Sequence, residues 1–429
     1  MRKILNPAQN AWADLTTRPT KNLEELEPGI KETFNLVQEK GDAALRELAE
    51  KFDKVTIENL LVSAEEIKAS DSKVSIELKE AILQAYSNIQ LFHTAQAEPV
   101  KQTETMPGVT CWRKSVAIEK VGLYIPGGTA PLFSTLLMLG VPARIAGCRE
   151  IVLCTPPSAD GSIHPAILYV ANVLGITKVV KAGGAQAIAA MAFGTESVPA
   201  VDKIFGPGNQ YVTVAKQLVN KYGVAIDLPA GPSEVLVIAD ESANPAFVAA
   251  DLLSQAEHGG DSQVVLLTTS AALLDQVEVE LKAQLDILPR KGFADKALSN
   301  SIGIVLHSVD DMLAFSNLYA PEHLILSIRN FDEVLDLITN AGSVFLGNYS
   351  PESAGDYASG TNHTLPTNGY ARAYSGVSLD SFVKKITFQY ITPAGLQNIG
   401  STIEVMAEAE GLQAHKNAVS IRLKEINHV

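Results

Sequence analysis

A glutamine and a histidine stand three positions apart in SQAEHGGDS, residues 254–262. Residues at positions i and i+3 share one face of a helix, so Gln255 and His258 are expected to point the same way. The glycines Gly259 and Gly260 resemble a helix C-cap, which would put both side chains in the last turn. An amide oxygen and an imidazole directed at one point indicate a metal or substrate site. The alternative for a lone histidine here is a capping or core residue.

An acid and an imidazole are adjacent in YAPEHL, residues 319–324. Neighbouring side chains diverge, so Glu322 and His323 could contact one substrate from two directions. Such a pair suits proton transfers, in which one group takes a proton that the other helps to move. The alternative is a loop carboxylate beside a polar histidine at the edge of a strand.

A segment rich in glycine and proline, residues 352–367, carries Asp356 and His363. It shows no apolar periodicity, so we predict a long loop without regular structure, of the kind that is usually functional. Asp and His are both zinc-ligand types. Glu410 and His415 form a further acid and imidazole pair near the C-terminus.

Strands and helices must position these residues. From about residue 115 short apolar runs alternate with helical patterns, which is typical of parallel sheets covered by helices. The strands are too numerous for one sheet, so we predict two α/β domains that divide near DLPAGPSE, residues 227–234. Residues 22–95 are predicted to be helical, 97–108 to be a connector, and the chain from about 378 to be helical again. The expected strands are residues 121–125, 150–155, 178–182, 203–206, 234–240, 263–269, 303–309 and 343–348.

Three of these strands run into glycine turns, at residues 126–128, 183–188 and 207–212. Turns of this kind lie at the carboxyl ends of parallel strands, where glycine lets the backbone approach a phosphate and helix N-termini favour anions. The pattern suits a dinucleotide. None of the turns has the G-x-G-x-x-G fingerprint, and each alone is also explained by a tight turn that needs positive φ.

Composition narrows the classes of protein. The 429 residues carry a net charge of −14, which argues against a nucleic-acid or anionic-membrane surface. The apolar run at 130–147 is too interrupted to span a bilayer, and no signal peptide is evident. Cys111, Cys148 and Cys154 form no C-x-x-C pair, so we expect small buried hydrophobic residues in a reducing cytoplasm.

Together these motifs resemble those of histidinol dehydrogenases, which catalyse the last two oxidations of histidine biosynthesis. The similarity runs from about residue 115 to 420 and rests on VGLYIPGG, GGAQAIAA, FGPGN, QAEHG, YAPEHL, ESAGDYASGTNHTLPT and EGLQAHKNAV, in their respective order along the chain. It implies an NAD-dependent four-electron oxidation of L-histidinol to L-histidine via histidinal. His323 would take the alcohol proton in each oxidation, and Glu322 would help to activate water between them.

The resemblance also implies an α/β fold of two incomplete Rossmann-like domains with parallel sheets, plus small helical N- and C-terminal extensions. We expect an N-terminal arm at 1–21, a discontinuous first α/β domain with the metal and catalytic residues at 22–120 and 233–377, a second, NAD-binding domain at 121–232, and a C-terminal helical extension at 378–429.

Roles for individual residues follow from the same resemblance. The family is a homodimer with a shared active site, so Glu410 and His415 would come from the partner. Glu322 and His323 would be catalytic. One zinc ion per subunit would be bound by Gln255, His258, Asp356 and His415; L-histidinol by Ser233, Gln255, His258, His323, Asp356, His363, Glu410 and His415; and NAD by Tyr124, Gln186 and Asn209.

Two other classes of protein use the same residue types. One is a zinc-dependent hydrolase of a small nitrogenous substrate; the absence of H-E-x-x-H and the glycine turns argue against it. The other is a non-catalytic metal- or nucleotide-binding protein, which has less need of the adjacent Glu322 and His323.

Overall fold

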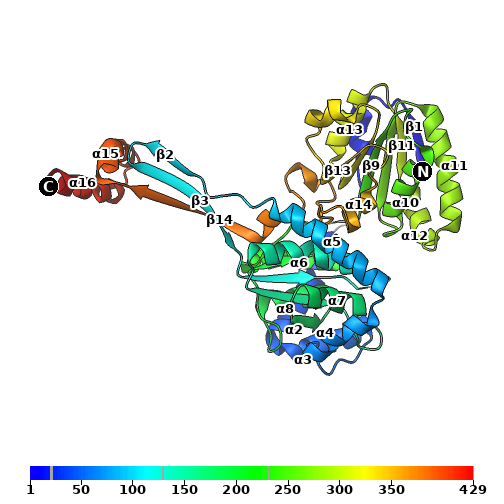
Figure 1. Ribbon diagram of the computed structural model, residues 1–429, viewed down its shortest axis with the longest axis horizontal. Helices are drawn as coiled ribbons and strands as arrows, with labels where there is room; N and C mark the ends of the chain where they lie inside the picture. The colour runs from blue at the N-terminus through cyan, green and yellow to red at the C-terminus, as the bar shows by residue number, and fades with distance from the viewer. Residues whose placement is uncertain (20–22, 128–129, 230, 429) are drawn as a thin grey trace. The chain divides into compact units, whose positions relative to one another are not determined.

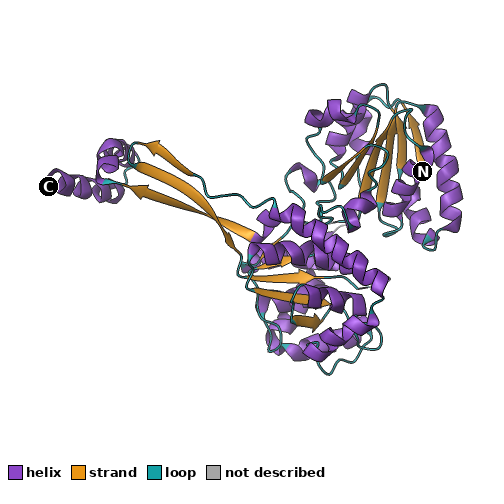
Figure 2. Ribbon diagram, viewed as in Figure 1, coloured by secondary structure: helices purple, strands orange, loops and turns teal. Residues whose placement is uncertain are grey.

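The computed structural model describes residues 1–19, 23–127, 130–229 and 231–428. Within them the chain forms two compact units. The larger unit contains Met1–Ala95 and Ile118–Ser381, and the smaller unit contains Gln96–Ala117 and Phe382–Val429. Helices alternate with parallel strands in the larger unit, whereas the smaller unit joins antiparallel strands to helices (Figure 1, Figure 2).

One parallel sheet of the larger unit, the β9 sheet, has the strand order β1-β11-β10-β9-β12-β13. Val235 and Val237 of β9 pack in one core cluster, and Leu236 and Ile238 pack in another. Successive side chains point to opposite faces of a strand, so this sheet is buried on both faces. Its strands are β1 (Arg2–Leu5), β9 (Glu234–Ala239), β10 (Gln263–Thr268), β11 (Ile302–Val305), β12 (His323–Ser327) and β13 (Ser343–Leu346); its helices are α1 (Trp12–Leu15), α10 (Pro245–Ala256), α11 (Ala271–Ile287), α12 (Lys291–Ser299), α13 (Val309–Tyr319) and α14 (Glu352–Tyr357).

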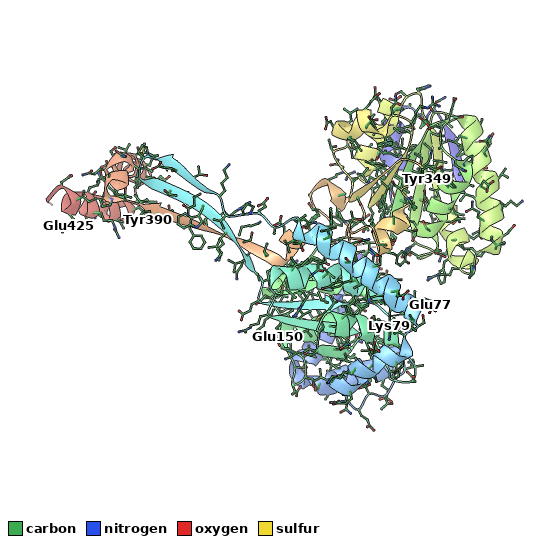
Figure 3. The ribbon with its side chains drawn as sticks, viewed as in Figure 1. Glu77, Lys79, Glu150, Tyr349, Tyr390 and Glu425 are labelled. Atoms are coloured by element: carbon green, nitrogen blue, oxygen red, sulfur yellow. The ribbon has the colours of Figure 1, made fainter. Side chains whose placement is uncertain are left out.

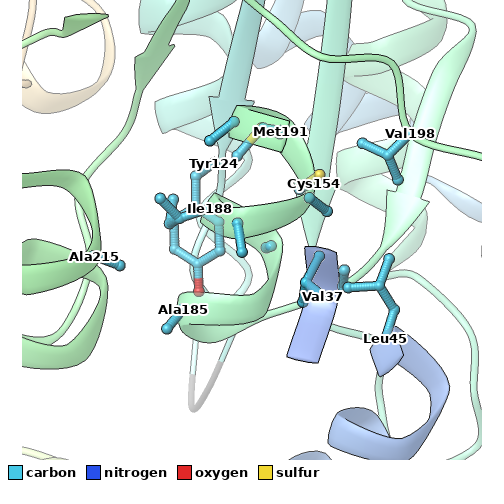
Figure 4. Packing of buried hydrophobic residues seen from close by; sticks show 14 of the residues in the cluster. Val37, Leu45, Tyr124, Cys154, Ala185, Ile188, Met191, Val198 and Ala215 are labelled. Atoms are coloured by element: carbon cyan, nitrogen blue, oxygen red, sulfur yellow. The ribbon is translucent and has the colours of Figure 1, made fainter. Parts of the chain in front are cut away.

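The other parallel sheet, the β4 sheet, has the order β6-β5-β4-β7-β8. Tyr124 and Cys154 from its strands pack against Ile188 and Met191 of α8 and against Val37 of α2 (Figure 4). Its strands are β4 (Lys120–Tyr124), β5 (Glu150–Thr155), β6 (Lys178–Lys181), β7 (Lys203–Phe205) and β8 (Ala225–Ile226); the helices of this half are α2 (Glu27–Lys40), α3 (Asp42–Leu48), α4 (Ala64–Ala69), α5 (Ile76–Thr94), α6 (Phe133–Ala146), α7 (Pro165–Val173), α8 (Gly184–Phe193) and α9 (Gln210–Val219).

The predicted α/β class is confirmed, and the apolar runs that the sequence marked as strands form β4 to β7, β9 to β11 and β13. The chain passes from the β4 sheet to the β9 sheet across residues 227–233, of which Ala230 lies outside the described residues. The apolar run at 130–147 forms the buried helix α6, and no described helix is long and apolar enough to cross a membrane. Cys148 and Cys154 are buried, and burial raises the pKa of both thiols.

The N-terminal region packs differently from the expected grouping. Residues 22–120 were expected to join 233–377, whereas Phe34 of α2 and Leu45 of α3 lie in the core of the β4 sheet. Arg2–Leu5, expected to belong to an arm, form the edge strand β1 of the β9 sheet. Helical periodicity shows which face of a helix is buried but not which sheet buries it, so the sequence could not decide between the two partners.

The smaller unit contains β2 (Gln102–Met106), β3 (Val109–Ala117) and β14 (Val383–Ile391) in the antiparallel order β14-β3-β2, with α15 (Pro393–Ala409) and α16 (Gln413–His428). The expected connector at 97–108 and the start of the expected helical extension are therefore strands in part. Ile386, Phe388 and Tyr390 alternate along β14 with the period of a strand. All three are exposed, and Tyr390 is visible in Figure 3.

Candidate active site

A cavity of about 490 Å³ lies within the larger unit and collects most of the candidate residues. Both halves of the unit line it. The half with the β9 sheet contributes Ser233, Gln255, His258, Glu322, His323, Asp356 and His363, and the half with the β4 sheet contributes, among others, Ser134, Thr135, Gly208, Asn209 and Thr213. Residues far apart in the sequence thus share one space, as an enzyme that acts on a small substrate requires.

The two sheets present opposite ends to this cavity. Ser233 precedes β9 and Glu322 precedes β12, so the β9 sheet contributes the amino ends of its strands. Pro207 and Gly208 follow β7, so the β4 sheet contributes a carboxyl end. Ligands of open α/β sheets usually bind at carboxyl ends, and the β9 sheet departs from that rule.

Glu322 and His323 form a buried pair at the start of β12, with side chains 8% and 3% exposed. The Oε2 atom of Glu322 lies 3.6 Å from Nδ1 of His323. Burial raises the pKa of Glu322 to about 8 against the opposing effect of His323. Burial by itself lowers the pKa of His323. The negative charge of Glu322 and, to a smaller extent, the interaction with Asp356 outweigh burial and raise that pKa to about 10. The alternative of an ordinary loop carboxylate beside a strand-edge histidine does not account for such burial and coupling.

Gln255 and His258 lie where α10 ends. The helix stops at Ala256 with Glu257 as its C-cap, so Gln255 is in the last turn and His258 lies beyond it. The expected glycine cap was wrong, because Glu257 caps the helix in the right-handed region and neither Gly259 nor Gly260 has positive φ. The N–H group of His258 donates to the carbonyl of Gln255 at 3.2 Å, which keeps both side chains at the cavity.

Asp356 lies on the short helix α14, so the expectation of a loop without regular structure was wrong for its first third. Its Oδ1 atom is 3.7 Å from Nε2 of His323. His363 follows in the irregular part, with Nδ1 2.8 Å from the carbonyl oxygen of Asp356 and Nε2 3.0 Å from Oγ1 of Thr135 in α6. His363 thereby connects the two halves of the larger unit beside the cavity.

The Asp, Glu and His side chains of this cavity do not by themselves form a metal site. Among the described residues, no group of three or more His, Cys, Asp or Glu side chains is arranged to hold a metal ion. Gln255 is of another type, and its buried Oε1 atom has no hydrogen-bond partner in the part of the chain that the structure describes. An unpartnered buried acceptor in a cavity that His258 and Asp356 also line is suited to be a ligand of a cation. Glu410 and His415 lie in the smaller unit, where both side chains are exposed, Glu410 as the C-cap of α15 and His415 in α16.

The residues expected to bind NAD lie at the carboxyl ends of the β4 sheet. Tyr124 is buried, and its hydroxyl accepts a hydrogen bond of 3.0 Å from the N–H group of Gly184. Gln186 is buried in α8, and neither residue lines the cavity. Asn209 is exposed at the cavity and caps α9 by accepting from Tyr211 and Val212. In the first glycine turn, Gly128 lies outside the described residues.

Sequence reasoning missed several buried charges around the pair. Glu234 is the first residue of β9 and is 2% exposed, and Arg18 binds it. Glu352 in α14 is 1% exposed, and burial raises its pKa to about 7. A charged residue that opens an otherwise apolar strand, as Glu234 does in EVLVIAD, is the signal that could have found the first of them.

Known proteins match this chain along almost its whole length. Residues 16–423 match the model of the family described as histidinol dehydrogenase. The histidinol dehydrogenase of Bacteroides thetaiotaomicron is 61% identical over 426 residues, which cover 99% of this chain and 100% of that protein. That of Yersinia pestis is 54% identical over 417 residues, covering 96% of this chain and 93% of that protein.

A solved structure agrees with these relatives. The crystal structure of histidinol dehydrogenase from Elizabethkingia anophelis superimposes with a TM-score of 0.98 at 60% identity, covering 100% of this chain and 99% of that chain. The resemblance noted in the motifs is thus confirmed over the full length. The chain belongs to the histidinol dehydrogenase family, the oxidoreductases of histidine biosynthesis.

Proposed function

We propose that this protein oxidises L-histidinol to L-histidine in two hydride transfers to NAD, with histidinal between them. The observation that carries the proposal is the buried Glu322 and His323 pair. His323 lines the cavity, and its Nε2 atom has no hydrogen-bond partner within the described ranges. Membership of the family supports the substrate and the reaction. Overall, the alcohol and one water become a carboxylate, two hydrides leave with NAD, and three protons are released.

In the first oxidation His323 accepts the proton of the substrate hydroxyl at Nε2 while the carbon gives up a hydride. NAD supplies the hydride acceptor, and the protein positions the substrate and moves its protons. Asp356, 3.7 Å from Nε2, stabilises the imidazolium that forms. His323 then releases this proton to solvent, and in the second oxidation it takes a proton from the hydrated aldehyde in the same way.

Between the two oxidations a water molecule must add to the aldehyde. Glu322 is the residue that we propose to guide this step, because its carboxylate lines the same cavity. Its pKa of about 8 lets it exist in both protonation states near neutral pH, so it can take a proton from water and pass it on. Ser233 and His363 line the same cavity and would contact the substrate.

We propose zinc as a further component, held by Gln255, His258 and Asp356 together with His415 of the partner subunit. The orphaned Oε1 atom of Gln255 supports this donor set. His258 lines the cavity, and the surrounding protein lowers its pKa by desolvation, so the neutral form that binds metals prevails near pH 7. When bound, zinc would orient the imidazole and amine of histidinol as a Lewis acid. Tyr124, Gln186 and Asn209 remain the proposed contacts to NAD.

The site would be shared between two subunits, because Glu410 and His415 are exposed in the smaller unit. Mixing of two inactive variants, His258→Asn and His415→Asn, tests this arrangement. A hybrid dimer would hold one intact site, so random mixing should restore about a quarter of the wild-type activity. If both residues served the same site from a single chain, mixing would restore nothing.

A zinc-dependent hydrolase is disfavoured, because the family is one of oxidoreductases. One assay tests the proposed function: the protein is mixed with L-histidinol and NAD, and absorbance of NADH is followed together with histidine. The expected result is two NADH for each histidine. Formation of histidine without NADH, or no reaction with histidinol at all, would contradict the proposal.

A further inference from the structure

We infer that Arg18 and Glu234 are positioning residues that hold His323 with one ring nitrogen facing the substrate. The inference deepens the proposed function and rests on His323 being its base. Neither residue lines the cavity, so neither is a catalytic residue. They act through the backbone at the start of β9, which contacts both members of the catalytic pair.

The main chain of Glu234 contacts both catalytic side chains. Its N–H group donates to Oε2 of Glu322 at 2.8 Å, and its carbonyl oxygen lies 3.0 Å from Nδ1 of His323. A carbonyl oxygen can only accept, so Nδ1 must carry a hydrogen atom in every protonation state of the ring. The nitrogen that gains and loses a proton is therefore Nε2. This atom is buried and has no hydrogen-bond partner among the described residues.

The side chain of Glu234 holds that backbone in place. Its two oxygens accept from Nε and Nη2 of Arg18 at 2.8 and 2.9 Å, a two-point contact that fixes direction as well as distance. The N–H group of Asn368 adds a third hydrogen bond of 2.8 Å. The carboxylate is 2% exposed, so solvent does not compete for these contacts.

Arg18 is in turn fixed by α13, which leads into the catalytic strand. Its guanidinium lies 3.7 Å from the centre of the Tyr319 ring and donates to the Tyr319 carbonyl at 2.7 Å. Tyr319 is four residues before His323. The Arg18 and Glu234 pair therefore connects β9 to the chain that enters β12, which are the two segments whose relative position sets the geometry of His323.

The test uses the double variant Arg18→Met/Glu234→Gln, which leaves no unpaired buried charge. We expect kcat for histidinol to fall about 10- to 100-fold, as for other supports of active-site histidines, and KM for NAD to stay within about twofold. The kinetic isotope effect with histidinol deuterated at the alcohol carbon should increase, because a misplaced base slows the hydride step. Arg18→Lys keeps the charge but not the two-point contact, and should lie between the double variant and wild type.

A matched control separates positioning from general loss of stability. Asp42 is another buried carboxylate, which accepts hydrogen bonds from Thr195 and Ser197 and does not line the cavity. Asp42→Asn should lower the melting temperature without changing the isotope effect. An equal change of the isotope effect in both variants would overturn the inference.

A second readout needs no activity. The ¹⁵N resonances of the His323 ring, identified by their loss in His323→Asn, report which nitrogen carries hydrogen when the ring is neutral. Wild type should show Nδ1 protonated, and the Arg18 and Glu234 variant should show a mixture of both tautomers. Unchanged resonances in that variant would refute the positioning role. Failure of wild type to reduce NAD with histidinol would instead refute the proposed function, and the two failures are thus distinguishable.

Discussion

The two sheets of the larger unit line one cavity with opposite ends of their strands, and the residues at those two ends differ in chemistry. At the amino ends of the β9 sheet, Glu234, Glu322 and His323 are buried charges or titratable groups in mutual contact. At the carboxyl ends of the β4 sheet, the turn after β7 and the helix N-terminus capped by Asn209 present uncharged groups. One end is suited to moving protons and the other to binding a ligand through its phosphates.

The difference shows what each kind of site requires of its surroundings. A carboxyl end with glycine turns binds an anion through geometry that neighbouring helices supply. Proton transfer needs shifted pKa values, which arise from burial and from charges held close together. The β9 sheet meets this need at its less common end because α10, α14 and the start of β12 bring Gln255, Asp356 and His323 together there.

The largest expected effect comes from removal of the base. His323→Asn should lower kcat for histidinol by about 10³-fold, because general acid–base catalysis by one side chain contributes about 10²- to 10⁴-fold. Steady-state NADH production measures this. His164→Asn is a matched control, since His164 caps α7 outside the cavity and asparagine also caps helices. Near-normal turnover by His323→Asn would mean that the residues at the amino ends of the β9 sheet do not catalyse the proton transfers.

Glu322→Gln should have the next largest effect, about 10²-fold on the oxidation of histidinol. Oxidation of added histidinal hydrate should suffer far less, because hydration is the step that Glu322 assists. Glu150→Gln, which alters a carboxylate paired with Lys178, provides the control. Equal losses with both substrates would argue that Glu322 supports His323 rather than water addition.

The pH dependence should follow the raised pKa values of the catalytic pair. His323 accepts a proton only when neutral, and its pKa is raised to about 10. Below that value the neutral fraction falls about tenfold for each pH unit, so kcat/KM for histidinol should rise from pH 7 toward the alkaline side. The pKa of Glu322, about 8, acts in the same direction. A profile that falls above pH 7 in a protein shown to stay folded would contradict these shifts.

The smallest effect on turnover is expected at the β4 sheet. Lys216 and Asp227 form a buried ion pair, and both bind the backbone of Gly206. Lys216 donates to the carbonyl oxygen of Gly206 at 2.7 Å, and the N–H group of Gly206 donates to Asp227 at 2.8 Å. This clamp fixes the turn that leads to Asn209. Asp227→Asn should raise KM for NAD about 10-fold, with kcat changed less than about twofold.

The control for that prediction is Lys178→Met, which breaks the more exposed pair with Glu150. Exposed pairs contribute little, so this variant should change neither parameter. If Asp227→Asn lowered kcat while KM for NAD stayed constant, the assignment of NAD binding to the carboxyl ends of the β4 sheet would be wrong.

Much of the fold follows from local patterns. Apolar runs such as EVLVIAD and QVVLLTT are strands because β-branched and leucine side chains fill both faces of a buried sheet. Local sequence patterns gave the wrong secondary structure where contacts with distant segments determined it. VKKITFQYI, expected to be helical, forms β14 because β3 pairs with it across nine residues on each strand. The end of α10 was misjudged because Glu257, and not a glycine, caps it.

By itself the sequence determined the α/β class, the family, and the residue types of the site, since these depend on local periodicity and on distinctive motifs such as YAPEHL. The tertiary structure alone decided which helices cover which sheet, that the pair lies at the amino ends of β9 and β12, and that Arg18 and Glu234 hold it. The reason is physical: burial and the distances between charges set pKa values and hydrogen-bond partners, and both arise largely from segments tens to hundreds of residues apart in the sequence.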